Sequence, residues 1–119
     1  MSWSVDRTVV AGADLSGQQY KFINYLGTLA GSQTAACKGV LQNKPQANEH
    51  GTCRFIGVSR LYMAVSVGLG AYIGISDATS GAGAIVTSGG HARGIARTAI
   101  SSGYSGEVEL FGGPVYLAK

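Results

Sequence analysis

The sequence predicts a small all-β fold, a compact barrel or sandwich built from two internally duplicated units and preceded by an N-terminal arm. The first observation is a series of short β-branched or aromatic runs bounded by Gly, Ser, Asn and Asp, with almost no helix signal. The second is a glycine content of 19 in 119 residues, well above the usual ~7%. The third is that residues 38–57 recur, without a gap, as residues 93–112. Short strands joined by glycine turns, made twice, account for most of the chain.

The repeat has a constant offset of 55 residues, and three glycine pairs fix its register: Gly39 and Gly94, Gly51 and Gly106, Gly57 and Gly112. Glycine is used where the backbone needs positive φ or close approach, so matched glycines indicate the same turns built twice. A unit of about 55 residues is marginal alone, so we expect the two copies to share one core. The expected organisation is an arm at 1–8 and a single β domain at 9–119, with duplicated units at about 9–64 and 65–119.

The expected strands follow from the apolar runs in chain order. In the first half they are the β-branched run 8–10, the aromatic run 20–25, the run 37–41 that ends on valine and leucine, the alternating run 52–58 and the apolar run 61–65. In the second half they are 72–75, 85–87, 93–98, 107–111 and 115–117. Pro45 and Pro114 come just beyond strand candidates, as is typical of turns or sheet edges.

The clearest alternation is at 107–110, where Glu107 and Glu109 share one face and two apolar residues share the other. Its first-half counterpart, 52–55, also directs apolar side chains inward, including Phe55. On the outward face Arg54 corresponds to Glu109, because 54 plus 55 is 109, so the copies present opposite charges. This asymmetry would orient neighbouring subunits head to tail. The alternative is that both charges serve only solubility, since exposed ion pairs contribute about 0–1 kcal/mol.

Charge is scarce and dispersed. Only 13% of residues are charged, about half of the usual ~25%. This favours an oligomer or a partner that covers part of the surface over a small, weakly charged monomer. The nine basic residues form no cluster in the sequence, which excludes a nucleic-acid-binding stripe. The N-terminus lacks a signal-peptide pattern, and no apolar run is long enough to span a membrane, so we expect a soluble protein made in the cytoplasm.

No residue pattern indicates a metal, a cofactor or catalysis. The possible ligands are Cys37, His50, Cys53 and His91, at spacings that match no zinc motif. Adding 55 to the cysteine positions gives alanine and valine, so we expect both cysteines to be buried small hydrophobes. His91 is interpreted as a loop histidine, and the few acidic residues are scattered, so the protein is not expected to be an enzyme.

Several of these segments together resemble the small capsid decoration (cement, head-stabilising) proteins of tailed phages. They are Gly-Val-Leu-Gln-Asn-Lys-Pro at 39–45, Gly51, Gly-Val-Ser-Arg at 57–60, Gly-Ile-Ala at 94–96 and Glu-Val-Glu-Leu at 107–110. The resemblance covers roughly residues 20–112. It implies a β-rich domain on the outer surface of an icosahedral head, where it stabilises the shell of major capsid protein, often as a homotrimer and without catalysis.

The contacts that this function would use are expected in three places, each with an alternative. Trp and Arg contribute disproportionately to interfaces, so the N-terminal arm is one candidate; the alternative is that Trp3 packs on its own domain. The polar loop around Pro45 is the second, or else it is a solvated turn. The third is the pair of oppositely charged outward positions. The candidate residues are Trp3, Val5, Arg7, Asn43, Lys44, Pro45, Arg54 and Glu109.

Two other functions remain open. A receptor- or glycan-binding β module of a phage head or tail fibre would expose clustered aromatic side chains. The six tyrosines fall mostly in strand-like positions, which favours packing instead. A small duplicated barrel enzyme would need a polar pocket with perturbed ionisable groups.

Overall fold

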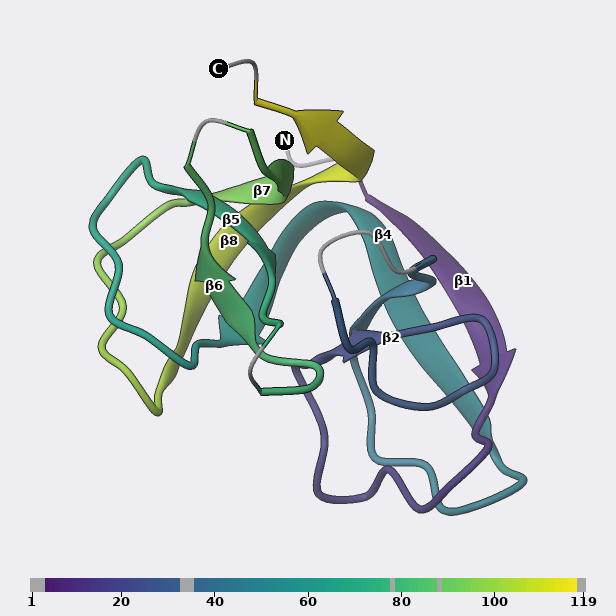
Figure 1. Cartoon of the computed structure of the whole chain (residues 1–119). Helices are drawn as coiled ribbons and strands as arrows, with labels where there is room; N and C mark the ends of the chain where they lie inside the picture. The colour runs from purple at the N-terminus through teal and green to yellow at the C-terminus, as the bar shows by residue number, and fades with distance from the viewer. Residues whose placement is uncertain (1–3, 33–35, 78, 88, 118–119) are drawn as a thin grey trace.

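The computed structural model describes residues 4–32, 36–77, 79–87 and 89–117, and it is built of strands and turns. The all-β prediction is confirmed (Figure 1). Within the described ranges, no helix is long and apolar enough to cross a membrane. The strands are β1 (Val5–Val10), β2 (Phe22–Ile23), β3 (Gly39–Leu41), β4 (His50–Tyr62), β5 (Tyr72–Ile75), β6 (Gly83–Ile85), β7 (His91–Ala96) and β8 (Ser105–Tyr116).

The strands lie in one antiparallel sheet in the order β2-β3-β4-β8-β7-β5-β6, with β1 paired to β4. The two longest strands, β4 and β8, pair with each other at its centre. Figure 1 shows β4 arching through the middle of the molecule, with β1 along one side and β5, β6 and β7 gathered on the other. An isolated bridge joins Met63, just after β4, to Gly83 of β6. The last strand in the order β4-β8-β7-β5-β6 therefore lies next to the end of the first one. This part of the sheet curls back on itself.

Strand boundaries differ from the sequence prediction at several places. β1 begins before the expected 8–10, β2 and β3 are shorter than the expected 20–25 and 37–41, and β6 and β7 each lie two residues earlier than the expected 85–87 and 93–98. The expected strands 52–58 and 61–65 merge into one strand, β4, which ends at Tyr62, and the expected strands 107–111 and 115–117 merge into β8, which ends at Tyr116. In β4 the polar Ser59 is accommodated because its hydroxyl accepts a hydrogen bond from the Gln42 amide and donates to the Arg60 carbonyl. In β8 the Gly-Gly-Pro sequence makes an irregularity within the strand instead of ending it.

The offset of 55 residues also relates strand pairs in space. Residues 40 and 41 of β3 pair with 54 and 53 of β4, and residues 95 and 96 of β7 pair with 109 and 108 of β8. A Cβ at Gly39 would collide with the carbonyl oxygen of Arg54, and a Cβ at Gly94 would collide with that of Glu109. Both halves therefore place a glycine where the backbone of β3 or β7 lies too close to its long neighbour for a side chain.

The buried side chains form two clusters. The larger one combines residues of both halves, including Leu61 and Met63 from the first and Ile73 and Val108 from the second. The smaller one is made by the first half alone, with Leu15, Ile23, Leu41 and Cys53 among its members. Neither half of the chain encloses the larger cluster by itself, because its members come from strands on both sides of the β4–β8 pair.

Candidate interaction groove

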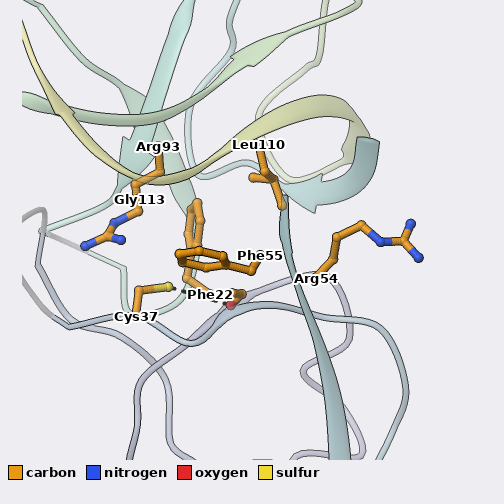
Figure 2. Close-up of a pocket in the computed structure, with 8 residues that line it drawn as sticks. Phe22, Cys37, Arg54, Phe55, Arg93, Leu110 and Gly113 are labelled. Carbon is orange, nitrogen blue, oxygen red and sulfur yellow. Dashed lines mark hydrogen bonds between the residues drawn. The ribbon is translucent and has the colours of Figure 1, made fainter. Parts of the chain in front are cut away.

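A groove of about 390 Å³ opens where β4, β7 and β8 meet the segments around Tyr25 and Cys37. A smaller cavity of about 10 Å³ adjoins it and shares Cys37, Phe55, Arg93 and Gly113 with it. Figure 2 shows the Phe55 ring near the centre of this cavity, with the guanidinium groups of Arg93 and Arg54 directed away from it to opposite sides. The described residues lining the groove are Tyr25, Ala36, Cys37, Phe55, Arg93, Gly112, Gly113 and Pro114.

Arg93 reaches the groove because of an irregularity between β7 and β8. Gly94 of β7 pairs with Leu110 of β8, and Ala92 of β7 pairs with Val115 of β8. Residues 111–114 of β8 therefore lie opposite a single residue of β7, Arg93. A bulge of this kind leaves backbone outside the ladder and re-aims the neighbouring side chains. Arg93 is only 7% exposed, yet it lines both the groove and the adjoining cavity. The bulge therefore places a buried cation at the groove wall.

Phe55 is directed to the groove by a second irregularity. β1 and β4 pair at Val5–Ile56 and then at Asp6–Arg54, so Phe55 is an extra residue in β4. The alternation at 52–55 predicted a buried side chain, but Phe55 is half-buried and lines the groove. The prediction for Phe55 is wrong because the bulge moves it out of the period-two pattern.

Cations surround the aromatic rings of the groove. The guanidinium carbon of Arg7 lies 3.4 Å from the centroid of the Phe55 ring, and Arg7 Nη1 donates a hydrogen bond of 2.8 Å to the Tyr25 hydroxyl. Lys38 Nζ lies 5.0 Å from the centroid of the Tyr25 ring. Each such contact contributes about 0.5–1 kcal/mol at a partly exposed site. Together with Arg93, these side chains give the groove a positive, aromatic character.

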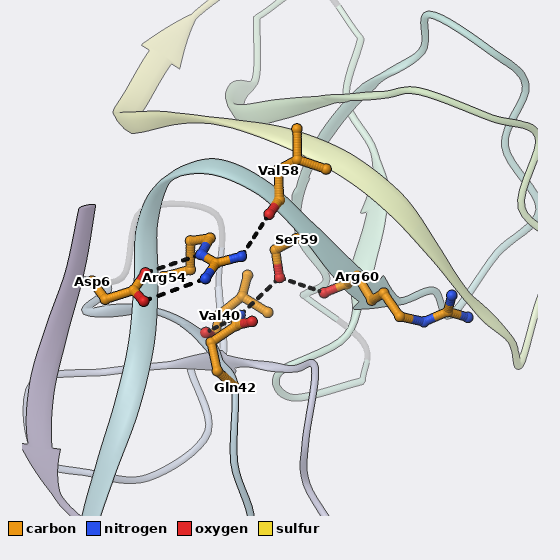
Figure 3. Close-up of polar contacts among 7 residues, drawn as sticks. All are labelled: Asp6, Val40, Gln42, Arg54, Val58, Ser59 and Arg60. Atoms are coloured by element: carbon orange, nitrogen blue, oxygen red, sulfur yellow. Dashed lines mark hydrogen bonds and ion pairs between the residues drawn. The ribbon is translucent and has the colours of Figure 1, made fainter. Parts of the chain in front are cut away.

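Arg54 is engaged within the chain (Figure 3). Its Nε lies 2.9 Å from Asp6 Oδ1, and its Nη1 donates a 2.9 Å hydrogen bond to the Val58 carbonyl. The hydrogen bond to Asp6 raises the pKa of Arg54 above its ordinary value. Asp6 is in β1 and Arg54 in β4, so the pair links the first strand to the centre of the sheet. Its two side chains are 28% and 35% exposed, so a contribution of about 0–1 kcal/mol is expected.

Glu109 is exposed on β8, opposite Val58 of β4 and Ile95 of β7. The alternation around it is confirmed, because Val108 and Leu110 are buried. Head-to-tail pairing between Arg54 of one subunit and Glu109 of another remains a prediction. It would compete with the ion pair that Arg54 makes to Asp6.

The loop around Pro45 lies far along β4 from the groove. Pairing of Val10 with His50 places this loop at one end of the β1–β4 ladder, whereas the bulge at Phe55 is at the other. Asn43 and Lys44 are exposed, and Pro45 is buried. The amide oxygen of Asn43 accepts a hydrogen bond from the Thr52 backbone, which fixes the loop to the start of β4.

The remaining predicted contact residues divide between the sheet and the undescribed N-terminus. Val5 and Arg7, assigned to an arm at 1–8, belong to β1 and pair with β4 of the same chain. Trp3 lies outside the described residues. The structure thus brings Arg7 and Arg54 close to the groove and separates them from Asn43, Lys44 and Pro45.

The two cysteines are buried, as predicted from their apolar counterparts in the second half. Burial raises the pKa of the Cys37 thiol, although the charge of Arg93 opposes this effect. Burial also raises the pKa of Cys53 to about 12. Both thiols are therefore protonated at neutral pH, and within the described residues no group of three or more His, Cys, Asp and Glu side chains is placed to hold a metal ion.

The tyrosines are less buried than predicted. Four of the six are exposed, at 52%, 42%, 69% and 54% of their surface: Tyr25, Tyr72, Tyr104 and Tyr116. The packing prediction fails for these four: Tyr72 is the first residue of β5, Tyr116 is the last of β8, Tyr25 is in a turn, and Tyr104 directly precedes β8. Tyr116 contacts His91 with ring centroids 5.3 Å apart. His91, predicted in a loop, is instead the first residue of β7 and pairs with Tyr116 of β8.

Sequence reasoning missed Tyr25, Phe55 and Arg93 as a cluster. One signal was present, because Lys38 and Arg93 are equivalent positions of the repeat (38 plus 55 is 93) and both are basic. The structure finds both beside the groove, Arg93 in its wall and Lys38 over the Tyr25 ring. No sequence pattern indicated that Tyr25 and Phe55 would lie together, because Phe55 reaches the groove through the bulge in β4.

No protein-family model matches the chain, and no curated protein sequence matches it. Among solved structures, the chain is similar to the head fiber gp8.5 N base in bacteriophage phi29, with a TM-score of 0.64 and 12% sequence identity. The match covers 95% of this chain and 98% of that chain. The two proteins therefore share a fold over nearly their full lengths.

Proposed function

We propose that this chain is a structural protein of a tailed-phage head that binds the outer surface of the assembled shell and stabilises it. The observation that carries the proposal is the fold likeness to a phage head fiber base, which spans almost the whole of both chains. It agrees with the resemblance of residues 39–60 and 94–110 to capsid decoration proteins. The proposed partner is the major capsid protein, and the proposed state is a homotrimer on the virion surface, with no enzymatic activity, cofactor or nucleic acid involved.

The proposed mechanism is thermodynamic linkage. A protein that binds the assembled shell but not its free subunits stabilises the shell by about 2.7 kcal/mol per site at a hundredfold excess over its dissociation constant. Repeated over many sites, this resists disassembly. A trimer would gain further from simultaneous engagement of several subunits. The low charge content of 13% supports a surface that a partner partly covers.

Purified protein and capsids of the matching phage test this function directly. The protein is expected to co-sediment with expanded capsids and not with free capsid subunits. Decorated capsids are expected to release their contents at a higher temperature than bare ones. Absence of co-sedimentation, or equal heat resistance of decorated and bare capsids, would refute the proposed role.

A receptor- or glycan-binding module of a fibre is the second candidate, and the exposed tyrosines favour it. Amphipathic rings at a surface are the side chains that sugar and protein ligands stack on. A glycan array would detect such binding, and Tyr104→Ala and Tyr116→Ala variants would weaken it. An array without signal removes this candidate and leaves capsid binding unaffected.

A further inference from the structure

The groove has one wall of backbone that lies outside the strand ladder. In the register of the described strands, residues 112–114 of β8 pair with neither β4 nor β7. No described atom lies within 4 Å of the position that a Cβ on Gly113 would take. Glycine backbone facing open space permits close approach by another backbone. This wall therefore suits an extended peptide segment.

The charge of the groove selects the kind of segment. Arg93 lines the wall, Arg7 lies over the Phe55 ring, and Lys38 lies over the Tyr25 ring. None of the described lining residues is acidic, and the nearby carboxylate of Asp6 is paired with Arg54. Charge-assisted hydrogen bonds from guanidinium groups to carboxylates are among the strongest in proteins. The complementary ligand is a chain that carries carboxylates.

We propose that this groove, walled by Phe55, Arg93 and residues 112–114, binds an extended acidic segment of a partner protein. The segment lies along the backbone at 112–114, its carboxylates face Arg7 and Lys38, and its apolar side chains contact Tyr25 and Phe55. If the proposed function holds, the segment belongs to the major capsid protein. Only this identification of the partner rests on the proposed function. The groove rather than the loop at 43–45 is then the specificity-determining contact.

A peptide titration tests the groove without capsids. The probe is a blocked peptide of alternating glutamate and leucine, and the matched control peptide replaces glutamate with glutamine. We expect the glutamate peptide to shift the backbone amide resonances of Gly112 and Gly113, and the glutamine peptide to bind about tenfold to a hundredfold more weakly. Equal binding of the two peptides, or no shift by either, overturns the proposal. Equal shifts by inorganic phosphate would show a small-anion site and would also overturn it.

Charge variants provide the second test. Lys38→Glu and Arg7→Gln remove half-buried cations that lie over the Tyr25 and Phe55 rings of the groove. Arg97→Glu is the control for Lys38→Glu, with the same charge change at an exposed position that directly follows β7. We expect the two groove variants to lose the glutamate peptide and the control to retain it, with thermal unfolding reporting that each is folded. Equal peptide binding by all variants refutes the groove. A change in oligomeric state in Lys38→Glu would show that a second copy occupies it, which also refutes the proposal.

Capsid binding separates this inference from the proposed function. If wild type co-sediments with capsids and the groove variants do not, both stand. If the groove variants co-sediment as well as wild type, the groove assignment fails and the capsid role survives. If wild type does not co-sediment at all, the capsid role fails, and the peptide titration alone decides whether the groove binds acidic segments.

Discussion

Substitution of Gly94 by alanine tests whether β7 must approach β8 as closely as the fold requires. A Cβ at this position would lie 2.6 Å from the Glu109 carbonyl oxygen and 2.8 Å from Val108 Cγ1. Both distances are below van der Waals contact, and the carbonyl belongs to the paired strand β8, so relief requires backbone movement. Overpacking of this kind costs about 1–3 kcal/mol. Gly94 does not have positive φ, so the cost is steric and not conformational.

The expected change in melting temperature follows from chain length. At about 2.1 cal/mol/K per residue, the 119 residues give an unfolding entropy of about 0.25 kcal/mol/K. A loss of about 1–3 kcal/mol therefore lowers the melting temperature by about 4–12 °C. Thermal unfolding followed by circular dichroism measures the melting temperature. Gly68→Ala is the control, because no described atom lies within 4 Å of its added Cβ and its φ is not positive; it is expected to be neutral or slightly stabilising. Melting of Gly94→Ala within about 2 °C of this control would refute the reasoning.

Three further predictions concern stability and thiol chemistry. A double-mutant cycle with Asp6→Asn and Arg54→Gln is expected to give a coupling energy of about 0–1 kcal/mol that decreases with salt, because the pair is partly exposed; a larger, salt-independent coupling contradicts this. The pKa of Cys53 is raised from 9.0 to about 12 in the folded state, so the neutral thiol is favoured: its stabilising effect is fully present below pH 9 and is lost as pH rises toward 12. Cys53→Ala should flatten that decline, and Ellman's reagent should modify native Cys53 only as fast as the protein unfolds. Leu61→Ala, at a fully buried position, is expected to cost about 2–5 kcal/mol in urea unfolding, whereas a cost below about 1 kcal/mol would contradict the packing of the larger core cluster.

Local sequence predicted secondary structure well where the period of apolar side chains matched a regular strand. The run 72–75 matches β5, and the alternation at 107–110 correctly placed Val108 and Leu110 inside. The cysteines were also placed correctly, because the repeat supplied an apolar counterpart for each. These correct predictions share a cause, because the alternation of apolar and polar residues within a strand predicts which of its faces is buried.

The errors share a different cause. The continuity of β4 and β8 was missed because Ser59-Arg60 and Gly-Gly-Pro are local break signals that sheet pairing overrides. The exposure of Tyr72, Tyr104 and Tyr116 was missed because they lie at or next to strand ends, and where a strand ends depends on where pairing stops. Neither is a property of any short window of sequence.

The order of residues alone predicts that the chain is all-β, that its two halves use glycine at equivalent positions, and that its cysteines are buried. These follow from side-chain period, glycine's backbone freedom and hydrophobicity, which act locally. The meeting of Phe55, Arg93 and Tyr25 in one groove depends instead on the assembled sheet. That meeting requires register shifts in two separate ladders, β1–β4 and β7–β8. A register shift arises from the pairing of distant segments, so its consequences appear only when the strands are assembled.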